Sequence, residues 1–359
     1  MKKFPLAASL GFASAAGAMA TILAGIGLFE TLSATTAHAA VRPSSATLTL
    51  INGWTNAPFG TSVAFADTAT STVQLKGAIA TTGTNPEPFV LPKAFRPETD
   101  VYVTIDLCDA TNGRLLIQPT GVVTVQAETT FTNAQCFTSL DGATYAKNTT
   151  GYNALTLING WAGGAYSTSA PAVALIGGVV RLKGAMSTSG TNTEPFLLPA
   201  GLRPSANVYV PTNLCNSAKG RLLIEPSGDV FVQAENNFSD AQCFTSLDGV
   251  SFTPASFKPL KLKHGWTDSI YGTLAPAAKE ISGVVRFQGS MSTSGTNTEP
   301  FVLPASLRPT TNVYIPVDMC NATNGRLNIS PSGVVTVEAE TSFSNAACFT
   351  SLDGASFIK

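Results

Sequence analysis

The chain has 359 residues, of which 44% are hydrophobic and only 12% are charged, and its formal net charge is −1. The charged fraction is about half of the 25% found in typical soluble domains. A net charge near zero without a basic run gives no support for electrostatic binding to nucleic acid or to anionic lipid.

Residues 1–39 are predicted to be a signal peptide. Lys2 and Lys3 form a positive start, residues 4–29 are uncharged, and Ala37 and Ala39 match an A-x-A cleavage site. The uncharged stretch is long enough to be an uncleaved membrane anchor instead, but its many Ala, Gly and Ser residues favour cleavage after Ala39. We therefore expect a secreted or cell-surface protein that is not inserted in a membrane after cleavage.

Three copies of one set of motifs follow the signal peptide. Trp54, Trp161 and Trp266 are 107 and 105 residues apart, and the sequences GRL and LDG recur with the same two spacings. This period is too long for a solenoid repeat, so each copy should have its own hydrophobic core. We predict three domains, and their bounds are 46–147, 152–256 and 258–359.

The residue pattern within each copy predicts β-strands. In the first copy TLTLING, STVQLKGAIAT, DVYVTIDLC, RLLIQ and VVTVQAE alternate apolar and polar residues. The sequences QPTGV, EPSGD and SPSGV place Pro and Gly as a three-residue hairpin requires. No helical stripe of useful length is present beyond the signal peptide. We expect an all-β fold with seven to nine strands per copy, arranged as a two-sheet, jelly-roll-like sandwich.

Each copy contains two cysteines, always 28 residues apart, and the second one begins the repeated sequence CFTSLDG, which is expected to be the closing strand. An even count in every copy of an exported protein predicts one disulfide per copy. The expected pairs are Cys108–Cys136, Cys215–Cys243 and Cys320–Cys348. Such a bond contributes about 3.6 kcal/mol in the chain-entropy treatment. No metal site and no other cofactor are expected, because the chain has neither close cysteine pairs nor accompanying histidines.

No catalytic residues are predicted, and the protein is not expected to be an enzyme. His264 is the only histidine after the signal peptide, and it occurs in one copy alone. Pairs of the recurring carboxylates could serve glycoside hydrolysis, but recurring arginines favour structural ion pairs and turn hydrogen bonds instead. The recurring acids are Glu87, Glu194, Glu299, Glu128, Glu235, Glu340, Asp141, Asp248 and Asp353, and the arginines are Arg96, Arg203, Arg308, Arg114, Arg221 and Arg326.

The candidate ligand-binding residues are a Trp, an Asn and a Glu in each copy. The Trp could stack on a sugar, although a Trp at a strand end is more often a half-buried core or capping residue. The loops TGTNPEPF and SGTNTEPF could hydrogen-bond to a glycan or simply complete a turn. The candidates are Trp54, Asn85, Glu87, Trp161, Asn192, Glu194, Trp266, Asn297 and Glu299.

The order of these motifs resembles a β-rich module of bacteriophage tail-fibre and receptor-binding proteins. The second copy carries it as VVRLKGAMSTSGTNTEPFLLPAGLRPSANVYVP, GRLLIEPSGDVFV and SLDGVSF, and the similarity covers nearly all of each copy. The resemblance implies a compact β-sandwich for adhesion or glycan recognition, often as a trimer. This chain differs by its signal peptide, its cysteines and its three fused copies, which indicate an exported bacterial protein and not a part of a virion.

The sequence thus predicts a non-enzymatic protein that binds a glycan or other surface polymer multivalently. The alternative is a structural component of the cell envelope or extracellular matrix. The linkers are about ten residues or fewer and span at most roughly 35 Å, so neighbouring copies must stay close. We expect a short rod instead of a pseudo-threefold cluster, because no repeated apolar surface is visible to drive clustering. The sequence does not specify the oligomeric state.

Overall fold

The computed structural model describes residues 44–69, 71–268 and 270–359. Residues Val41–Lys359 form one compact unit, which is described by itself below. The predicted signal peptide, residues 1–39, lies outside the described residues. No helix in the described part of the chain is long and apolar enough to cross a membrane.

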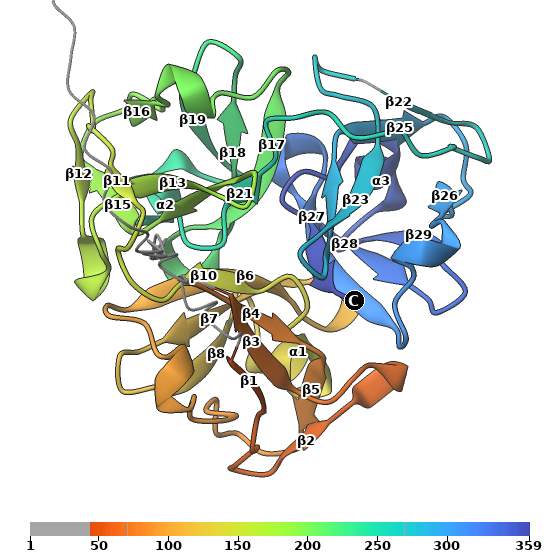
Figure 1. The fold of residues 1–359 in the computed structure, drawn as a ribbon, viewed down its shortest axis with the longest axis horizontal. Helices are drawn as coiled ribbons and strands as arrows, with labels where there is room; N and C mark the ends of the chain where they lie inside the picture. The colour runs from red at the N-terminus through yellow and green to blue at the C-terminus, as the bar shows by residue number, and fades with distance from the viewer. Residues whose placement is uncertain (1–43, 70, 269) are drawn as a thin grey trace, which may run out of the picture. The chain divides into compact units, whose positions relative to one another are not determined.

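The unit consists of three repeated sets of short antiparallel strands, here called modules 1, 2 and 3 (Figure 1). Module 1 contains β1 (Ser44–Thr47), β2 (Trp54–Asn56), β3 (Phe65–Ala69), β4 (Thr72–Lys76), β5 (Ala78–Thr81), β6 (Val101–Asp106), β7 (Asn112–Ile117), β8 (Val123–Ala127), β9 (Thr138–Ser139) and β10 (Thr144–Ala146). Module 2 contains β11 (Asn153–Ala154), β12 (Trp161–Gly163), β13 (Ala172–Ile176), β14 (Val179–Lys183), β15 (Ala185–Thr188), β16 (Phe196–Leu197), β17 (Val208–Asn213), β18 (Lys219–Ile224), β19 (Asp229–Ala234), β20 (Thr245–Ser246) and β21 (Ser251–Phe252). Module 3 contains β22 (Trp266–Asp268), β23 (Ala277–Ile281), β24 (Val284–Gln288), β25 (Ser290–Thr293), β26 (Phe301–Val302), β27 (Val313–Asp318), β28 (Asn324–Ile329), β29 (Val334–Ala339), β30 (Thr350–Ser351) and β31 (Ser356–Ile358).

The three modules share one sheet topology. In module 1 the sheets have the strand orders β1-β3-β4-β10, β2-β5-β9 and β6-β7-β8, and the other modules repeat this arrangement with small changes at the edges. The expectation of seven to nine strands per module is too low for the described residues, because several strands are only two or three residues long. The predicted hairpin is confirmed: β7 pairs with β8 around Gly121, which has a φ of 91° that favours glycine.

Each module has its own hydrophobic core, as the long period predicts. The core of module 1 includes Phe89 and Tyr145, that of module 2 includes Phe196, and that of module 3 includes Phe301 and Phe357. These side chains are almost fully buried, since the strands turn their apolar residues inward. The three cores lie within the predicted domain ranges. Whether each range folds alone stays a prediction.

A short helix precedes the closing segment of each module and was not expected from the sequence. The helices are α1 (Phe131–Cys136), α2 (Phe238–Cys243) and α3 (Phe343–Cys348). Thr130 and Ser342 cap the first and the last of them, since each side chain accepts a hydrogen bond from a backbone N–H of the first turn. One and a half turns are too short to produce a recognisable hydrophobic stripe.

The predicted disulfide pairing is confirmed in all three modules, with Cα atoms 5.8, 5.8 and 5.9 Å apart. Each bond joins a 3₁₀ turn to the last residue of the short helix, and these turns are Cys108–Ala110, Cys215–Ser217 and Cys320–Ala322. The strands predicted at DVYVTIDLC and CFTSLDG therefore do not contain the cysteines. The CFTSLDG segment is not one closing strand either: in module 1 it contains the short strand β9 and a turn at Gly142, and β10 follows the segment.

The three modules contact one another in a closed cycle. A serine of each CFTSLDG segment donates a hydrogen bond of 2.6 Å to a tyrosine carbonyl of another module, and the pairs are Ser246–Tyr102, Ser351–Tyr209 and Ser139–Tyr314. Strands β6, β17 and β27 meet at the centre of the three modules (Figure 1). The expectation of a rod is wrong, because module 1 contacts module 3 as well as module 2. Because the contacting surfaces mix aromatic, hydroxyl and carboxyl groups, their residues form no apolar pattern that could be recognised in the sequence.

Candidate ligand site at the seams between modules

We call the contact between strand β6, β17 or β27 of one module and the CFTSLDG segment of the next module a seam. Seam 1–2 joins β6 to module 2, seam 2–3 joins β17 to module 3, and seam 3–1 joins β27 to module 1. The seams are built alike because the same residue types recur at equivalent positions. They bring together side chains that lie more than 140 residues apart in the chain.

The aspartate of each SLDG sequence accepts a hydrogen bond within its own module, and Asp248 and Asp353 also accept one from the neighbouring module. In seam 1–2 one carboxylate oxygen of Asp248 accepts a hydrogen bond from Gly184 N at 2.9 Å, and the other accepts one from Tyr102 N at 3.5 Å. Burial raises the pKa of Asp248 to about 7, although both backbone hydrogen bonds act in the opposite direction. Asp248 thus accepts structural backbone hydrogen bonds, but the donors lie outside its own turn, since Gly184 is 64 residues away and Tyr102 belongs to module 1.

Two aromatic rings close the inner part of each seam. Tyr102 and Phe244 lie edge to face, with ring centroids 5.0 Å apart, and both are buried. The equivalent pairs are Tyr209–Phe349 at 5.1 Å and Tyr314–Phe137 at 5.0 Å. Edge-to-face pairs of this kind contribute about 0.5–1.5 kcal/mol beyond the area that they bury.

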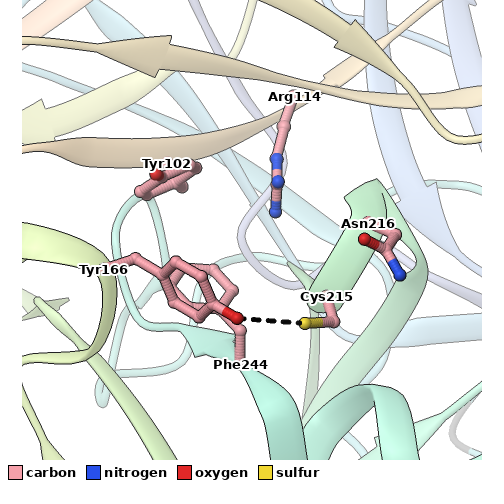
Figure 2. A pocket seen from close by; sticks show the side chains of 6 residues that line it. All are labelled: Tyr102, Arg114, Tyr166, Cys215, Asn216 and Phe244. Carbon is pink, nitrogen blue, oxygen red and sulfur yellow. Dashed lines mark hydrogen bonds between the residues drawn. The ribbon is translucent and has the colours of Figure 1, made fainter.

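A third aromatic ring lies over each inner pair and is largely exposed. Tyr166, Tyr271 and Phe59 have exposed fractions of 58, 60 and 61%, and each ring centroid is about 5.5 Å from the buried phenylalanine. In seam 1–2 the hydroxyl of Tyr166 also lies near the disulfide, 3.9 Å from Cys215 Sγ (Figure 2). Every seam therefore presents one aromatic side chain to solvent at an equivalent position.

The backbone of these exposed aromatics is in the left-handed region, which bulky residues rarely adopt. The φ angles of Phe59, Tyr166 and Tyr271 are 55°, 53° and 52°. The adjacent module holds the loop in place: Asn207 Nδ2 donates to Tyr271 O at 3.0 Å, and Asn312 Nδ2 donates to Phe59 O at 2.9 Å. The left-handed conformation thus recurs at the equivalent aromatic residue of all three modules.

An arginine lies on the tyrosine in each seam. The guanidinium carbon of Arg114 is 4.7 Å from the Tyr102 ring centroid, and its Nη1 donates to Leu214 O of module 2 at 2.9 Å. Arg221 and Arg326 lie 4.9 and 5.0 Å from the rings of Tyr209 and Tyr314 in the same way. The arginine thus combines a cation–π contact with a hydrogen bond across the seam.

The three arginines differ in their counter-charges. Arg221 pairs with Asp318 at 2.9 Å, and Arg326 pairs with Asp106 at 3.1 Å. Arg114 meets the neutral Asn213 instead, and burial lowers the pKa of Arg114 to about 10. The predicted partners of these arginines were the recurring acids, but the ion pairs of the described residues are made with other acids. The other recurring arginines make no ion pair in the described residues. These are Arg96, Arg203 and Arg308, and the Nε atom of Arg96, for example, donates to Leu91 O.

Two seams contain small cavities beside these groups. A cavity of about 70 Å³ in seam 1–2 is lined by Tyr102, Arg114, Tyr166, Cys215, Asn216 and Phe244 (Figure 2). One of about 110 Å³ in seam 3–1 is lined by Phe59, Cys108, Asp109, Phe137, Tyr314 and Arg326. No cluster of metal-ligating side chains is found in the described parts of the chain.

The structure places the sequence-predicted ligand residues away from the seam cavities. The tryptophans are only 5–6% exposed, and the indole of Trp54 donates its N–H to Asn85 O at 2.9 Å and lies edge-on to Phe131. Asn85 Oδ1 accepts a hydrogen bond from Glu87 N at 2.9 Å and so closes the turn. The equivalent residues Trp161, Asn192 and Glu194, and Trp266, Asn297 and Glu299, make the same contacts.

The side-chain oxygens of Asn85, Asn192 and Asn297 are used in these turns, but the three residues are exposed. Ligand binding by these asparagines stays a prediction. The tryptophan rings are not accessible for stacking on a sugar, which agrees with a core or capping role. Sequence reasoning did not assign the seam tyrosines and the GRL arginines to a ligand site, although the tyrosine recurs in VYV or VYI and the arginine in GRL in all three copies.

Comparison with protein-family models, with curated proteins and with solved structures gave no match.

Proposed function

We propose that the protein is an exported, non-enzymatic binding protein whose three seams hold a glycan or another surface polymer. The observation that carries this proposal is the exposed aromatic on a left-handed backbone in every seam. An aromatic face binds the apolar face of a sugar, while the arginine and asparagine side chains beside it can donate hydrogen bonds to hydroxyl or acidic groups. The cavities are too small for a whole sugar chain, so the polymer would lie across the surface.

Three equivalent sites in one chain favour a multivalent ligand. Sites fixed relative to one another raise avidity by roughly 10²–10⁴ over a single site when the target repeats. The cyclic contacts also support the proposal, based on the phage-module resemblance, that three fused sandwich modules replace a trimer of separate chains. In this proposal each module is a jelly-roll-like sandwich. The CFTSLDG segments make the contacts that would form between separate chains in a trimer.

The three disulfides indicate an oxidising environment. Secretion or display on the cell surface is the proposed location, supported by the predicted signal peptide. A non-enzymatic role is supported by the use of the recurring aspartates: Asp141, Asp248 and Asp353 are buried and accept backbone hydrogen bonds.

A glycan array probed with residues 40–359 tests the proposal. We expect saturable binding to a defined glycan class, and loss of that binding in the triple variant Phe59→Ala, Tyr166→Ala, Tyr271→Ala. The matched control is Leu197→Ala, which removes another exposed apolar side chain outside the seams. If the triple variant binds as well as the unmodified protein, the seams are not the site, and variants of Asn85, Asn192 and Asn297 become the next test.

The structural alternative predicts a different result. A component of an envelope or matrix would form an ordered assembly without any glycan, and the array would show no saturable binding. The small size of the seam cavities is the observation that favours this alternative.

A further inference from the structure

A cavity separate from the seams lies where the corresponding strands β4, β14 and β24 of the three modules approach one another. Its volume is about 130 Å³. Its lining includes Asp67, Thr72 and Gln74 of module 1, Arg181 of module 2 and Arg286 of module 3. All three modules contribute to it, and it shares no lining residue with the seam cavities.

Two buried arginines face this cavity. Gln74, Arg181 and Arg286 occupy equivalent positions of β4, β14 and β24. Arg181 and Arg286 are only 7% and 5% exposed, and the Nε atom of each has no hydrogen-bond partner among the described residues. The hydroxyl of Thr72, which also lines the cavity, has no partner in this part of the chain either.

The charges around these arginines leave the cavity positive. Neither arginine has an acidic partner within ion-pair distance in the described residues. Asp67 is the only acid in the lining, so the lining carries two positive charges and one negative. Burial lowers the pKa of Arg286 to about 9, and repulsion from Arg181 adds to this effect. Tyr152 and Arg181 both line a further small cavity, and burial raises the pKa of the Tyr152 hydroxyl to about 12.

Two buried guanidinium groups whose Nε–H groups lack hydrogen-bond partners in the part of the chain that the structure describes are energetically unfavourable. A buried charge needs a partner and hydrogen bonds to offset its lost hydration, and each unsatisfied N–H adds its own desolvation penalty. Arginine keeps its charge, so it cannot avoid this desolvation penalty by releasing a proton as a buried lysine does. A ligand that supplies negative charge and several acceptor oxygens would remove both problems.

We propose that this cavity binds a small inorganic oxyanion of the sulfate or phosphate class. The planar fork of arginine matches two oxygens of such an ion, and two arginines from different modules would hold it from two sides. Gln74 and Thr72 add neutral donors from module 1. The arginines are more than nine-tenths buried, which fits a free ion better than a group on a bulky polymer. The bound ion joins the three modules at one point.

The test measures sulfate and phosphate binding by calorimetry and thermal unfolding at constant ionic strength, with chloride as the balancing anion. We expect saturable binding of one oxyanion per chain and a melting temperature that rises with sulfate. Arg286→Gln introduces the residue that module 1 has at this position, and it should weaken the affinity at least tenfold. The double variant Arg181→Gln, Arg286→Gln should lose the binding, while the exposed control Lys93→Gln should keep it.

Three results would overturn the proposal. The first is equal stabilisation by chloride and by sulfate, and the second is unchanged sulfate binding in the double variant. The third is binding of a sulfated polysaccharide, lost in the double variant, without binding of free sulfate, because the source would then be a polymer. If the double variant does not unfold cooperatively, crystals soaked in selenate decide: an anomalous peak within hydrogen-bond distance of both Nε atoms supports the site, and its absence contradicts it.

Discussion

Two places where all three modules meet bury positive charge in opposite ways. Lys219 of module 2 is buried, and its ammonium donates to Asp318 at 3.0 Å, Gly220 O at 3.0 Å and Ala322 O at 3.4 Å. Its backbone N–H also donates to Glu128 of module 1. Arg181 and Arg286 are buried to a similar extent, but their Nε atoms have no partner in the described residues.

The difference shows how the three copies have become unequal. At the Lys219 position modules 1 and 3 carry Asn112 and Asn324, which donate to carbonyls of the next module at 2.7 Å. The lysine of module 2 meets an aspartate, Asp318, so its charge is compensated within the protein. The arginines at the other place have no such compensation. A charge that the protein pairs holds the modules together, and a charge that it leaves unpaired indicates a ligand.

The first prediction removes the compensation at Lys219. Asp318→Asn should lower the free energy of unfolding by about 3–5 kcal/mol, the usual effect of leaving one partner of a buried ion pair alone. The effect is measured by chemical denaturation of the full chain. The exposed Asp268→Asn is the control and should change stability by less than about 0.5 kcal/mol. A loss below 1 kcal/mol for Asp318→Asn would mean that Lys219 is not buried with this partner.

The second prediction concerns the seam serines, which make the same hydrogen bond in each seam. Ser139→Ala, Ser246→Ala and Ser351→Ala should each cost about 1–3 kcal/mol, because a buried tyrosine carbonyl loses its donor. Denaturant unfolding of the three single variants measures this, with the exposed Ser227→Ala as the control. Three clearly unequal losses would contradict the equivalence of the seams.

The features of the fold that depend on residues close in the sequence could be predicted, whereas those that depend on contacts between modules could not. The three modules, the disulfides and the hairpin at Gly121 follow from spacing and local turn residues, and all are confirmed. The short helix that ends at Cys136 gives too few residues for a pattern. The cyclic arrangement was missed because Ser246 and Asp248 look like ordinary turn residues, although their partner Tyr102 lies in another module.

The candidate site could not be predicted for the same reason. Trp54 stands out in the sequence, yet its ring is buried and its N–H is bonded inside the module. Tyr166 does not stand out, because a single tyrosine in a loop gives no sign that it lines a cavity together with Tyr102 and Arg114 of module 1. The predicted roles of Asn85 and Glu87 in ligand binding remain open to the array experiment.

The third prediction concerns the glutamates around Lys219. Burial is the main reason that the pKa values of Glu235 and Glu340 are raised to about 7, with repulsion among Glu128, Glu235 and Glu340 as a further cause. The folded state then keeps protons that the unfolded state releases near pH 4–5, so stability falls as the pH rises from about 4.5 to 7. In thermal unfolding at pH 5 and pH 8, the double variant Glu235→Gln, Glu340→Gln should show a smaller decrease than the unmodified chain, by on the order of 2 °C. Identical decreases would exclude these glutamates as the cause.

The smallest effect is expected at the arginine cavity. Asp67→Asn removes the only acid from its lining and should tighten sulfate binding about two- to fivefold, the size expected for a partly exposed charge. Calorimetry with sodium sulfate measures it, and Asp268→Asn again provides the control. Weaker binding in Asp67→Asn would show that the carboxylate orients the arginines instead of competing with the anion.

The closed cycle of modules is the claim on which the seams and the arginine cavity both depend. Small-angle X-ray scattering of residues 41–359 tests it directly, because a rod and a closed cycle differ in radius of gyration. A compact domain of this length has a radius of gyration of about 20 Å, and three separate hundred-residue modules in a row would have about 30 Å or more. We predict a value near 20 Å for the monomer. A value near 30 Å would contradict the contact between modules 1 and 3.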